Sequence, residues 1–358
     1  MLSLMLGTTL LIGSGPSYAA PTSRPTTAAG FVYTANERGN SISVINLHTR
    51  QVGTVTVSIS PHNVQTSPDG RLLFAVGMAA SKTAGGAAMG SMEQMNTGKK
   101  THGMLLILDT ARLNAKRTVN AQGAPSIEVG SEPAHVVVDR RCRRAYVTNG
   151  ADNTVSVVDV VRRKVIATIA TGASPHGLRI SPDGREIYVA DVKDNSVSVI
   201  SVAAAKEVIR IPVGKGPVQV GFTPNGRRVY VSLRDENSIA VIDAARRKRI
   251  AVVPVGRSPI QLFVTPNGRT VYVANQGTES NPGNTVSVVA TASNRVVATL
   301  VTGRGAHGVV VSKDGKDAFI ANSFADTVSI IDTATQKVVH SIKVGKGPNG
   351  ITFGSAAR

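Results

Sequence analysis

The sequence predicts an all-β protein, a single seven-bladed β-propeller of four-stranded antiparallel blades, and three observations predict it. A spacing of 42 residues separates the successive aromatic residues Tyr146, Tyr188, Tyr230 and Tyr272. Each repeat contains short hydrophobic segments divided by turn residues. The first and last segments of the repeat region can pair with each other to complete one blade. Seven aromatic anchors mark seven repeats, and they are Tyr33, Phe74, Tyr146, Tyr188, Tyr230, Tyr272 and Phe319.

Four strands are expected in each repeat, as the third anchor illustrates. Residues 145–149 contain the anchor, and residues 154–158 alternate strictly in polarity, which is typical of a half-buried strand. A third strand is expected at 164–169 after a basic turn, and a fourth at 176–180 after a Gly-x-x-Pro sequence. The repeats end in SPDG or TPNG, where proline presets φ and glycine accepts positive φ.

The two ends of the repeat region are expected to pair and to close the ring. An anchor strand lies at 31–35, and a lone strand of the fourth type lies at 350–354. Pairing these two strands would complete one blade and leave no open sheet edge. The propeller is therefore expected to span residues 31–354, with an insertion at about 79–103 in a loop at one end of the ring.

The N-terminal segment predicts export. Residues 1–19 are expected to be a signal peptide, because residues 2–12 are mostly apolar and small residues suitable for cleavage after Ala19 follow. Residues 20–30 are expected to form a flexible leader rich in Pro, Thr and Ala. The predicted location is periplasmic or secreted. The remaining chain has no apolar run long enough to span a bilayer. It contains a single cysteine, so no internal disulfide supports the fold.

The repeat resembles the YVTN-type β-propeller family, whose motif stands at residues 146–149. The resemblance covers nearly the whole propeller region and implies the fold. Similar propellers occur in archaeal surface-layer proteins, lactonases, the large subunit of a quinoprotein amine dehydrogenase and nitrous oxide reductase. The family therefore implies no single activity.

Antiparallel connectivity places the Gly-x-x-Pro loops at one end of the ring, here called the top, beside the central channel. Each blade presents a His, Gln or Asn there, and basic residues precede this position in four blades. The expected ligand-binding residues are His62, His135, His176, Gln219, Gln261, His307, Asn349, Lys215, Arg257, Arg304 and Lys346. The alternative is that these histidines only hydrogen-bond neighbouring loops.

The insertion in the second repeat contains the candidate metal ligands, which are Met89, Met92, Met95, His102 and Met104. Thioether and imidazole groups suit copper, and methionine selects Cu(I). The predicted function is therefore a non-catalytic binding propeller whose top face takes a small ligand, a protein partner or a transition metal such as copper. A methionine-rich loop can also be an adaptable protein-binding surface.

The opposite end, here called the bottom, collects basic turns such as residues 140–144 and 246–249, and the net charge is +18. This face either docks on an anionic envelope surface or simply keeps the protein soluble. Nucleic acid is not an expected partner, because no aromatic residues are interleaved with the basic ones for base stacking.

An enzyme is the alternative function, either a lactonase-like hydrolase or a redox-associated subunit. The sequence contains no G-x-S-x-G, H-E-x-x-H, C-x-x-C-H or Walker motif. A hydrolytic site would need an acid–base pair at the channel mouth. The acidic residues of the top loops, Glu37 among them, are expected to lie further out than the histidines.

Overall fold

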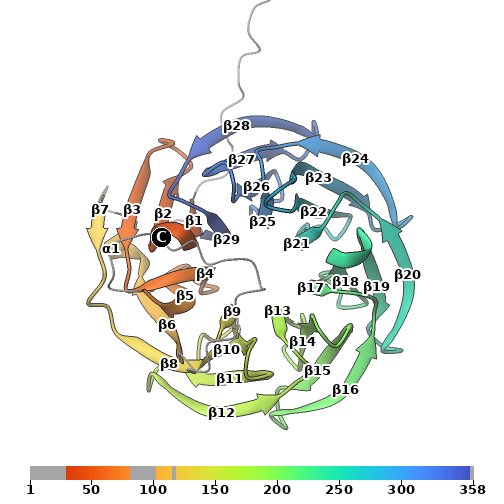
Figure 1. Cartoon of the computed structure of the whole chain (residues 1–358), viewed down its shortest axis with the longest axis horizontal. Coiled ribbons are helices and arrows are strands. Elements are labelled where there is room, and N and C mark those ends of the chain that lie inside the picture. Colours follow the sequence, from red (N-terminus) through yellow and green to blue (C-terminus); the bar gives the residue numbers. More distant parts are fainter. Residues whose placement is uncertain (1–29, 81–101, 115–117, 355–358) are drawn as a thin grey trace, which may run out of the picture.

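The chain folds into a closed ring of seven blades around a central axis, as the computed structural model shows (Figure 1), and the space along this axis is called the channel below. The structure describes residues 30–80, 102–114 and 118–354. Within these residues all ladders are antiparallel except the pairing of β3 with β7, and the predicted fold class is confirmed. No helix among them is long and apolar enough to cross a membrane.

Blades 1 to 3 contain the termini and the insertion. Blade 1 has the order β29 (Pro348–Gly354), β1 (Phe31–Asn36), β2 (Ser41–Asn46), β3 (Val52–Thr56) and β7 (Thr118–Asn120). Blade 2 has β4 (Ile59–Thr66), β5 (Leu72–Ala79), β6 (His102–Asp109) and β8 (Ser126–Ser131). Blade 3 has β9 (Pro133–Val138), β10 (Arg144–Asn149), β11 (Thr154–Asp159) and β12 (Lys164–Ala170). The short helices are η1 (Glu37–Gly39), α1 (Thr110–Asn114) and η2 (Arg234–Glu236).

Blades 4 to 7 repeat one pattern, in which the first strand is innermost and the fourth lies on the rim (Figure 1). Blade 4 has β13 (Pro175–Ile180), β14 (Glu186–Asp191), β15 (Ser196–Ser201) and β16 (Lys206–Pro212). Blade 5 has β17 (Pro217–Phe222), β18 (Arg228–Leu233), β19 (Ser238–Asp243) and β20 (Lys248–Pro254). Blade 6 has β21 (Pro259–Val264), β22 (Thr270–Gly277), β23 (Pro282–Ala290) and β24 (Arg295–Val301). Blade 7 has β25 (Ala306–Val311), β26 (Asp317–Asn322), β27 (Thr327–Asp332) and β28 (Lys337–Lys343).

Closure occurs as the sequence predicts. β29 pairs with β1 over a register that includes Phe31 with Gly354 and Tyr33 with Thr352. The innermost strand of blade 1 thus comes from the C-terminal end of the propeller, and the next three strands, β1 to β3, come from the N-terminal end. The sequence did not predict β7, which adds a fifth strand to the outer edge of blade 1.

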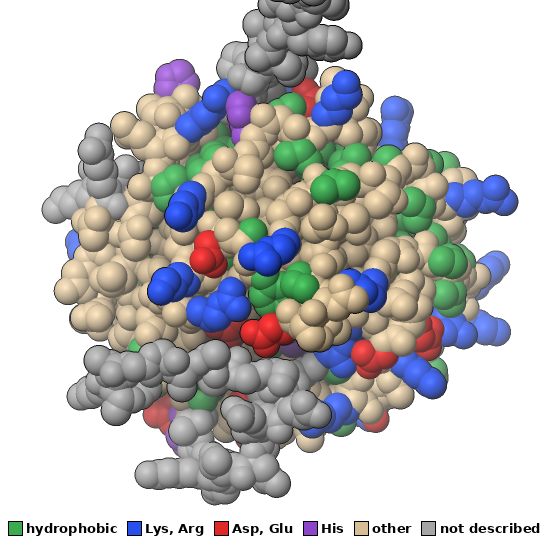
Figure 2. Space-filling model, turned by 45° about the horizontal axis from the view of Figure 1, so that its top comes forward, with side chains coloured by type: hydrophobic (Ala, Val, Ile, Leu, Met, Phe, Trp, Pro, Cys, Tyr) green, Lys and Arg blue, Asp and Glu red, His purple; other side chains and the backbone are tan. Residues whose placement is uncertain are grey.

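The hydrophobic core lies between the blades. All seven aromatic anchors are buried, and each apolar cluster joins strands of neighbouring sheets. Tyr146 of blade 3, for example, shares a cluster with Leu178 and Val189 of blade 4. Lys and Arg side chains project from the rim on the visible side of the surface (Figure 2). The packed layers between blades hold the innermost strands, and therefore the channel wall, in fixed positions.

A buried hydrogen-bond network repeats at the end of the anchor strands. Asn149 donates from Nδ2 to the hydroxyls of Thr154 and Ser156, at 2.9 Å each. Asn36, Asn275 and Asn322 make the same pair of bonds. Blade 4 instead has Asp191, whose Oδ2 lies 2.6 Å from the Ser198 hydroxyl. Burial raises the pKa of Asp191 to about 7.

Replacing Asp191 with Asn is expected to stabilise the protein by about 2 kcal/mol at pH 8. In the unfolded chain this carboxyl ionises near the ordinary aspartate pKa of 3.8, whereas in the folded protein it holds its proton to about 7. Wild-type stability therefore falls as pH rises through this window, and the variant lacks that fall. Urea unfolding at pH 5 and pH 8 measures the difference. Asp194→Asn, in the same loop and paired with Arg210 at 2.7 Å, is the control. A gain independent of pH would contradict the explanation.

Candidate functional site

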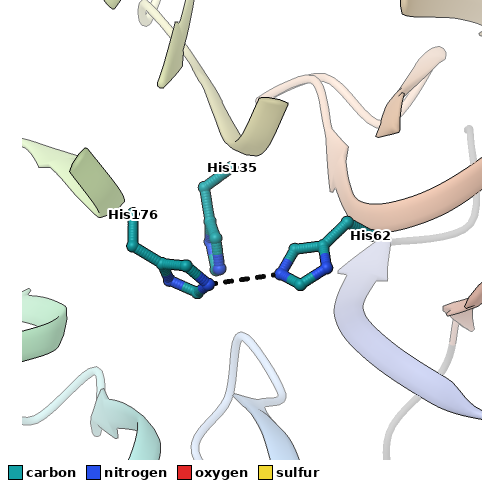
Figure 3. A group of neighbouring side chains, drawn as sticks. All are labelled: His62, His135 and His176. Atoms are coloured by element: carbon teal, nitrogen blue, oxygen red, sulfur yellow. Dashed lines mark hydrogen bonds between the residues drawn. The ribbon is translucent and has the colours of Figure 1, made fainter. Parts of the chain in front are cut away.

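The top end of the channel is lined by the first residues of the innermost strands. A register shift occurs at this position in each innermost strand, for example between Pro175 and Leu178 of β13 and between Pro61 and Asn63 of β4. Such bulges redirect a side chain from the regular alternation of a strand. His176 and His62 lie within these two bulges and point toward the channel axis (Figure 3).

Glycine follows three of the channel residues for a steric reason. A Cβ on Gly177 would lie 2.5 Å from the carbonyl oxygen of Val218, in the neighbouring blade. A Cβ on Gly308 would meet the Asn349 carbonyl oxygen, and one on Gly350 would lie 2.6 Å from the Asn63 Cα. The His-Gly and Asn-Gly pairs therefore let adjacent innermost strands approach closely where the polar side chains converge.

Three histidines from consecutive blades meet at the mouth of the channel. His62, His135 and His176 each offer a ring nitrogen, and these nitrogens all lie within 4.8 Å of one another. The Nε2 atoms of His62 and His176 are 3.3 Å apart and face each other, and the tip of the His135 ring lies beside the gap (Figure 3). The ring of His307, from blade 7, lies 6.5 Å from that of His62.

Two of the three rings are oriented through their Nδ1 atoms. His62 Nδ1 lies 3.0 Å from Glu37 Oε1, and His176 Nδ1 lies 3.2 Å from the Val218 carbonyl oxygen. A carboxylate or carbonyl accepts the proton that each ring carries on Nδ1. The two Nε2 atoms lie within hydrogen-bond distance of each other, so one of them carries a proton in the metal-free protein, and a metal ion would displace it. Both Nε2 atoms border the same small volume as potential ligands.

His135 is held differently. Its side chain is completely buried, and its Nε2 has no hydrogen-bond partner among the described residues. Its Nδ1 lies 3.4 Å from Nε2 of Gln219, whose Oε1 accepts from the Val220 amide at 2.9 Å. The Gln219 amide therefore donates toward Nδ1 and places the ring proton on Nε2. A buried polar atom without a partner is costly. The atom here, His135 Nε2, faces the gap between His62 and His176 (Figure 3).

Glu37 corrects an expectation from the sequence. It was expected to lie further out than the histidines, but it contacts His62, and Asn349 donates from Nδ2 to its Oε2. Burial would raise the pKa of Glu37, but the adjacent His62 outweighs burial and lowers it. Burial would likewise lower the pKa of His62, and Glu37 raises it instead. The two form a partly buried acid–base pair.

The other three histidines at the channel mouth, His135, His176 and His307, are neutral at physiological pH. Burial lowers the pKa of His135 and His176 well below the usual value, and neighbouring histidines add to the effect. Burial also lowers the pKa of His307 to about 4. Neutral imidazole is the form that binds metal ions. The arrangement can therefore hold a metal ion, or use His62 and Glu37 for proton transfer.

The structure gathers only part of the predicted ring. Gln219, Gln261, His307 and Asn349 are buried at the channel wall with the three clustered histidines. The four basic residues predicted with them are exposed on the loops outside, and they are Lys215, Arg257, Arg304 and Lys346. Arg257, for example, donates to the Asn281 carbonyl oxygen at 2.8 Å.

The predicted methionine site lies mostly outside the described residues, because these do not include Met89, Met92 or Met95. His102 is exposed and pairs with Glu128 at 3.1 Å. Met104 is partly buried and packs against the core between blades 1 and 2. The described residues therefore give the predicted copper site no further support.

Two residues near the cluster were missed. Glu37 lies on η1, in the loop after the first anchor strand, and nothing in its spacing shows that this loop reaches His62. Arg179 lies on the innermost strand β13, where the repeat pattern has mostly apolar or small residues. The charge of Arg179, at a position that is mostly apolar or small in the other repeats, was the one indication that the sequence offered for this residue.

Two models of propeller families match separate stretches of the chain. Residues 108–249 match the seven-bladed β-propeller lactonase model, and residues 267–358 match the YNCE-like β-propeller model. Neither is named for YVTN-type repeats, so that finer assignment stays a prediction. No curated protein matches the chain.

Solved structures show the same fold. Hydrazine synthase of Kuenenia stuttgartiensis matches with a TM-score of 0.65 and 20% identity, covering 83% of this chain and 96% of that one. A functionally unknown protein of Desulfotomaculum acetoxidans has a TM-score of 0.69 and 18% identity, with 90% and 98% covered. A putative 6-phosphogluconolactonase of Bacteroides fragilis matches with a TM-score of 0.69 and 14% identity, and the match covers 92% of this chain and 99% of that one. The chain is a seven-bladed β-propeller with sequence similarity to lactonase-type and YNCE-like propellers.

Proposed function

We propose that the protein binds a divalent transition-metal ion at the mouth of its central channel, through His62, His135 and His176. The observation that supports this proposal is the convergence of three ring nitrogens within 4.8 Å, from three separate blades. Four strands and a packed interface stand behind each histidine, so the site is formed before any ligand arrives. Preorganisation of this kind lowers the cost of binding.

The donor set indicates the class of metal. Imidazole suits Zn(II), Cu(II), Ni(II) and Fe(II), whereas the methionine loop would select Cu(I). Three protein ligands leave at least one coordination position for water or a small molecule, as in catalytic rather than structural zinc sites. Glu37 and the Val218 carbonyl serve as the outer partners that such ligands require. The predicted signal peptide supports an extracytoplasmic location for this site.

The test is calorimetric titration of metal-free protein, residues 20–358, with Zn(II), Cu(II) and, under a competing chelator, Cu(I). We expect about one equivalent of divalent metal per chain, with Co(II) giving the absorption of a nitrogen-ligated centre. A variant with Met89, Met92, Met95 and His102 changed to Ala should bind divalent metal equally well. Loss of all binding in that variant would assign the metal to the methionine loop instead. No binding by the wild type would refute the proposal.

A lactone hydrolase is the second candidate. The lactonase-model match over residues 108–249 favours it, and so does the Glu37–His62 pair. A carboxylate on Nδ1 leaves Nε2 of the histidine free to activate water as a general base. Hydrolysis of simple lactones by metal-free protein, lost in His62→Gln, would establish this function without a metal ion.

A further inference from the structure

The channel wall near the three histidines contains a guanidinium group without a carboxylate partner. Arg179 lies on β13, three residues after His176, and donates from Nη1 to the Leu178 carbonyl oxygen at 2.9 Å. It forms no ion pair with any described residue, and burial is the one cause that shifts its pKa. Burial alone lowers the pKa of Arg179 to about 10, so its charge persists at neutral pH.

Arg179 lies within electrostatic reach of the histidine cluster. Burial is the main cause of the low pKa of His135, and the charge of Arg179 is one of the further causes. Along the innermost strands, Arg179 is two positions further from the top than His135, a rise of about 7 Å. The long arginine side chain can cover much of that interval. Arg179 thus shares the innermost strand β13 with His176, and its charge acts on His135.

Two other arginines near the mouth are paired with carboxylates. Arg38 lies 3.9 Å from Asp326, and Arg234 lies 2.8 Å from Asp235. Glu37 is committed to His62 and Asn349. Arg179 is therefore left with an uncompensated charge on the channel wall even without metal. A divalent ion on the three histidines would add two further positive charges, and Glu37 is the carboxylate in contact with the cluster among the described residues. Arg179 is partly buried, and an excess of charge in such a place is costly unless a counter-ion enters.

We propose that the channel binds a small carboxylate, with Arg179 as its principal recognition residue. The planar guanidinium fork matches the two oxygens of a carboxylate. When the proposed metal site is loaded, the open coordination position faces the same space, so the anion can also contact the metal. That second contact rests on the proposed function, whereas recognition by Arg179 does not.

Acetate is the probe for this site, and it is added to metal-free protein in a buffer without other carboxylates. Thermal unfolding and calorimetry should both report binding, at a Kd of about 1 mM for one charge-assisted pair. Arg179→Met, which keeps the apolar stem, should weaken binding at least about tenfold. Arg179→Lys should restore it only partly, because lysine lacks the fork. Arg257→Met, at the exposed rim, is the matched control and should bind as the wild type does.

The same titration of Co(II)-loaded protein separates this inference from the proposed function. If the loaded site forms, acetate should shift the visible spectrum of the Co(II) protein at concentrations below the Kd measured by calorimetry for the metal-free protein. Arg179→Met should reduce this spectral shift. If cobalt does not bind but acetate binding still depends on Arg179, the anion site stands without the metal site. Equal responses of the wild type and Arg179→Met, or no acetate binding by folded wild type, would overturn the inference.

Discussion

Replacing His176 with Ala should weaken metal binding by at least about 100-fold, or about 2.7 kcal/mol. His176 Nε2 is one of two nitrogens that face each other 3.3 Å apart, and its Nδ1 is held by the Val218 carbonyl. Loss of one ligand from three leaves only His62 and His135, from two blades. Calorimetric titration with Zn(II) gives the affinity, and the Co(II) spectrum reports the change in coordination.

His307→Ala is the matched control for that experiment. His307 occupies the equivalent position in blade 7, is also followed by glycine and also bonds through Nδ1 to a carbonyl, that of Asn349 at 3.1 Å. It does not belong to the group of nitrogens within 4.8 Å. Its removal should leave the affinity within about threefold of the wild type. Equal losses in both variants would show that the three-histidine group is not the binding site.

Gln219→Glu should tighten divalent metal binding by about tenfold to 100-fold, the usual range for the outer partner of a metal ligand. In the wild type, one amide must accept from the Val220 N–H and donate toward His135 Nδ1. That arrangement leaves the proton on His135 Nε2, where a metal would bind. A carboxylate accepts at both oxygens, so it satisfies Val220 and fixes the proton on Nδ1.

The gain in affinity should come with a loss of stability in the metal-free protein, because a buried carboxylate replaces a neutral amide. Added Zn(II) should then raise the unfolding temperature of Gln219→Glu more than that of the wild type. Gln261→Glu, at the equivalent position in blade 6 and also buried, is the control. It places a carboxylate in the channel wall away from His135 and should not tighten binding. An unchanged affinity in Gln219→Glu would mean that His135 is not a ligand.

The fold could be predicted from the sequence because its determinants are local and repeated. The anchor aromatics, the alternating strands and the Pro-Asp-Gly turns each specify one part of a blade. β7 was not predicted, because its three residues pair in parallel with β3 and have no repeat signature. The predicted polar ring at the channel mouth was likewise visible, since a His, Gln or Asn recurs in every repeat, one or two residues after the Pro or Ala near the start of the innermost strand.

Which members of that ring meet depends on the tertiary structure. His62, His135 and His176 lie in three repeats, and the bulges and the closed ring bring their nitrogens together. Lys215 and Arg257 belong to the same loops by sequence, yet the turns direct them to the exposed rim.

Short-range patterns in the sequence specify a seven-bladed propeller with polar residues at one channel mouth, because such patterns encode strands, turns and their order. Blade packing and ring closure bring Glu37 to His62, let Gln219 set the proton of His135, and leave Arg179 without a counter-charge among the described residues. The first two contacts join residues that are 25 and 84 positions apart, and the third feature depends on what surrounds the side chain in space. No local pattern encodes such relations, since the closed ring fixes all of them together.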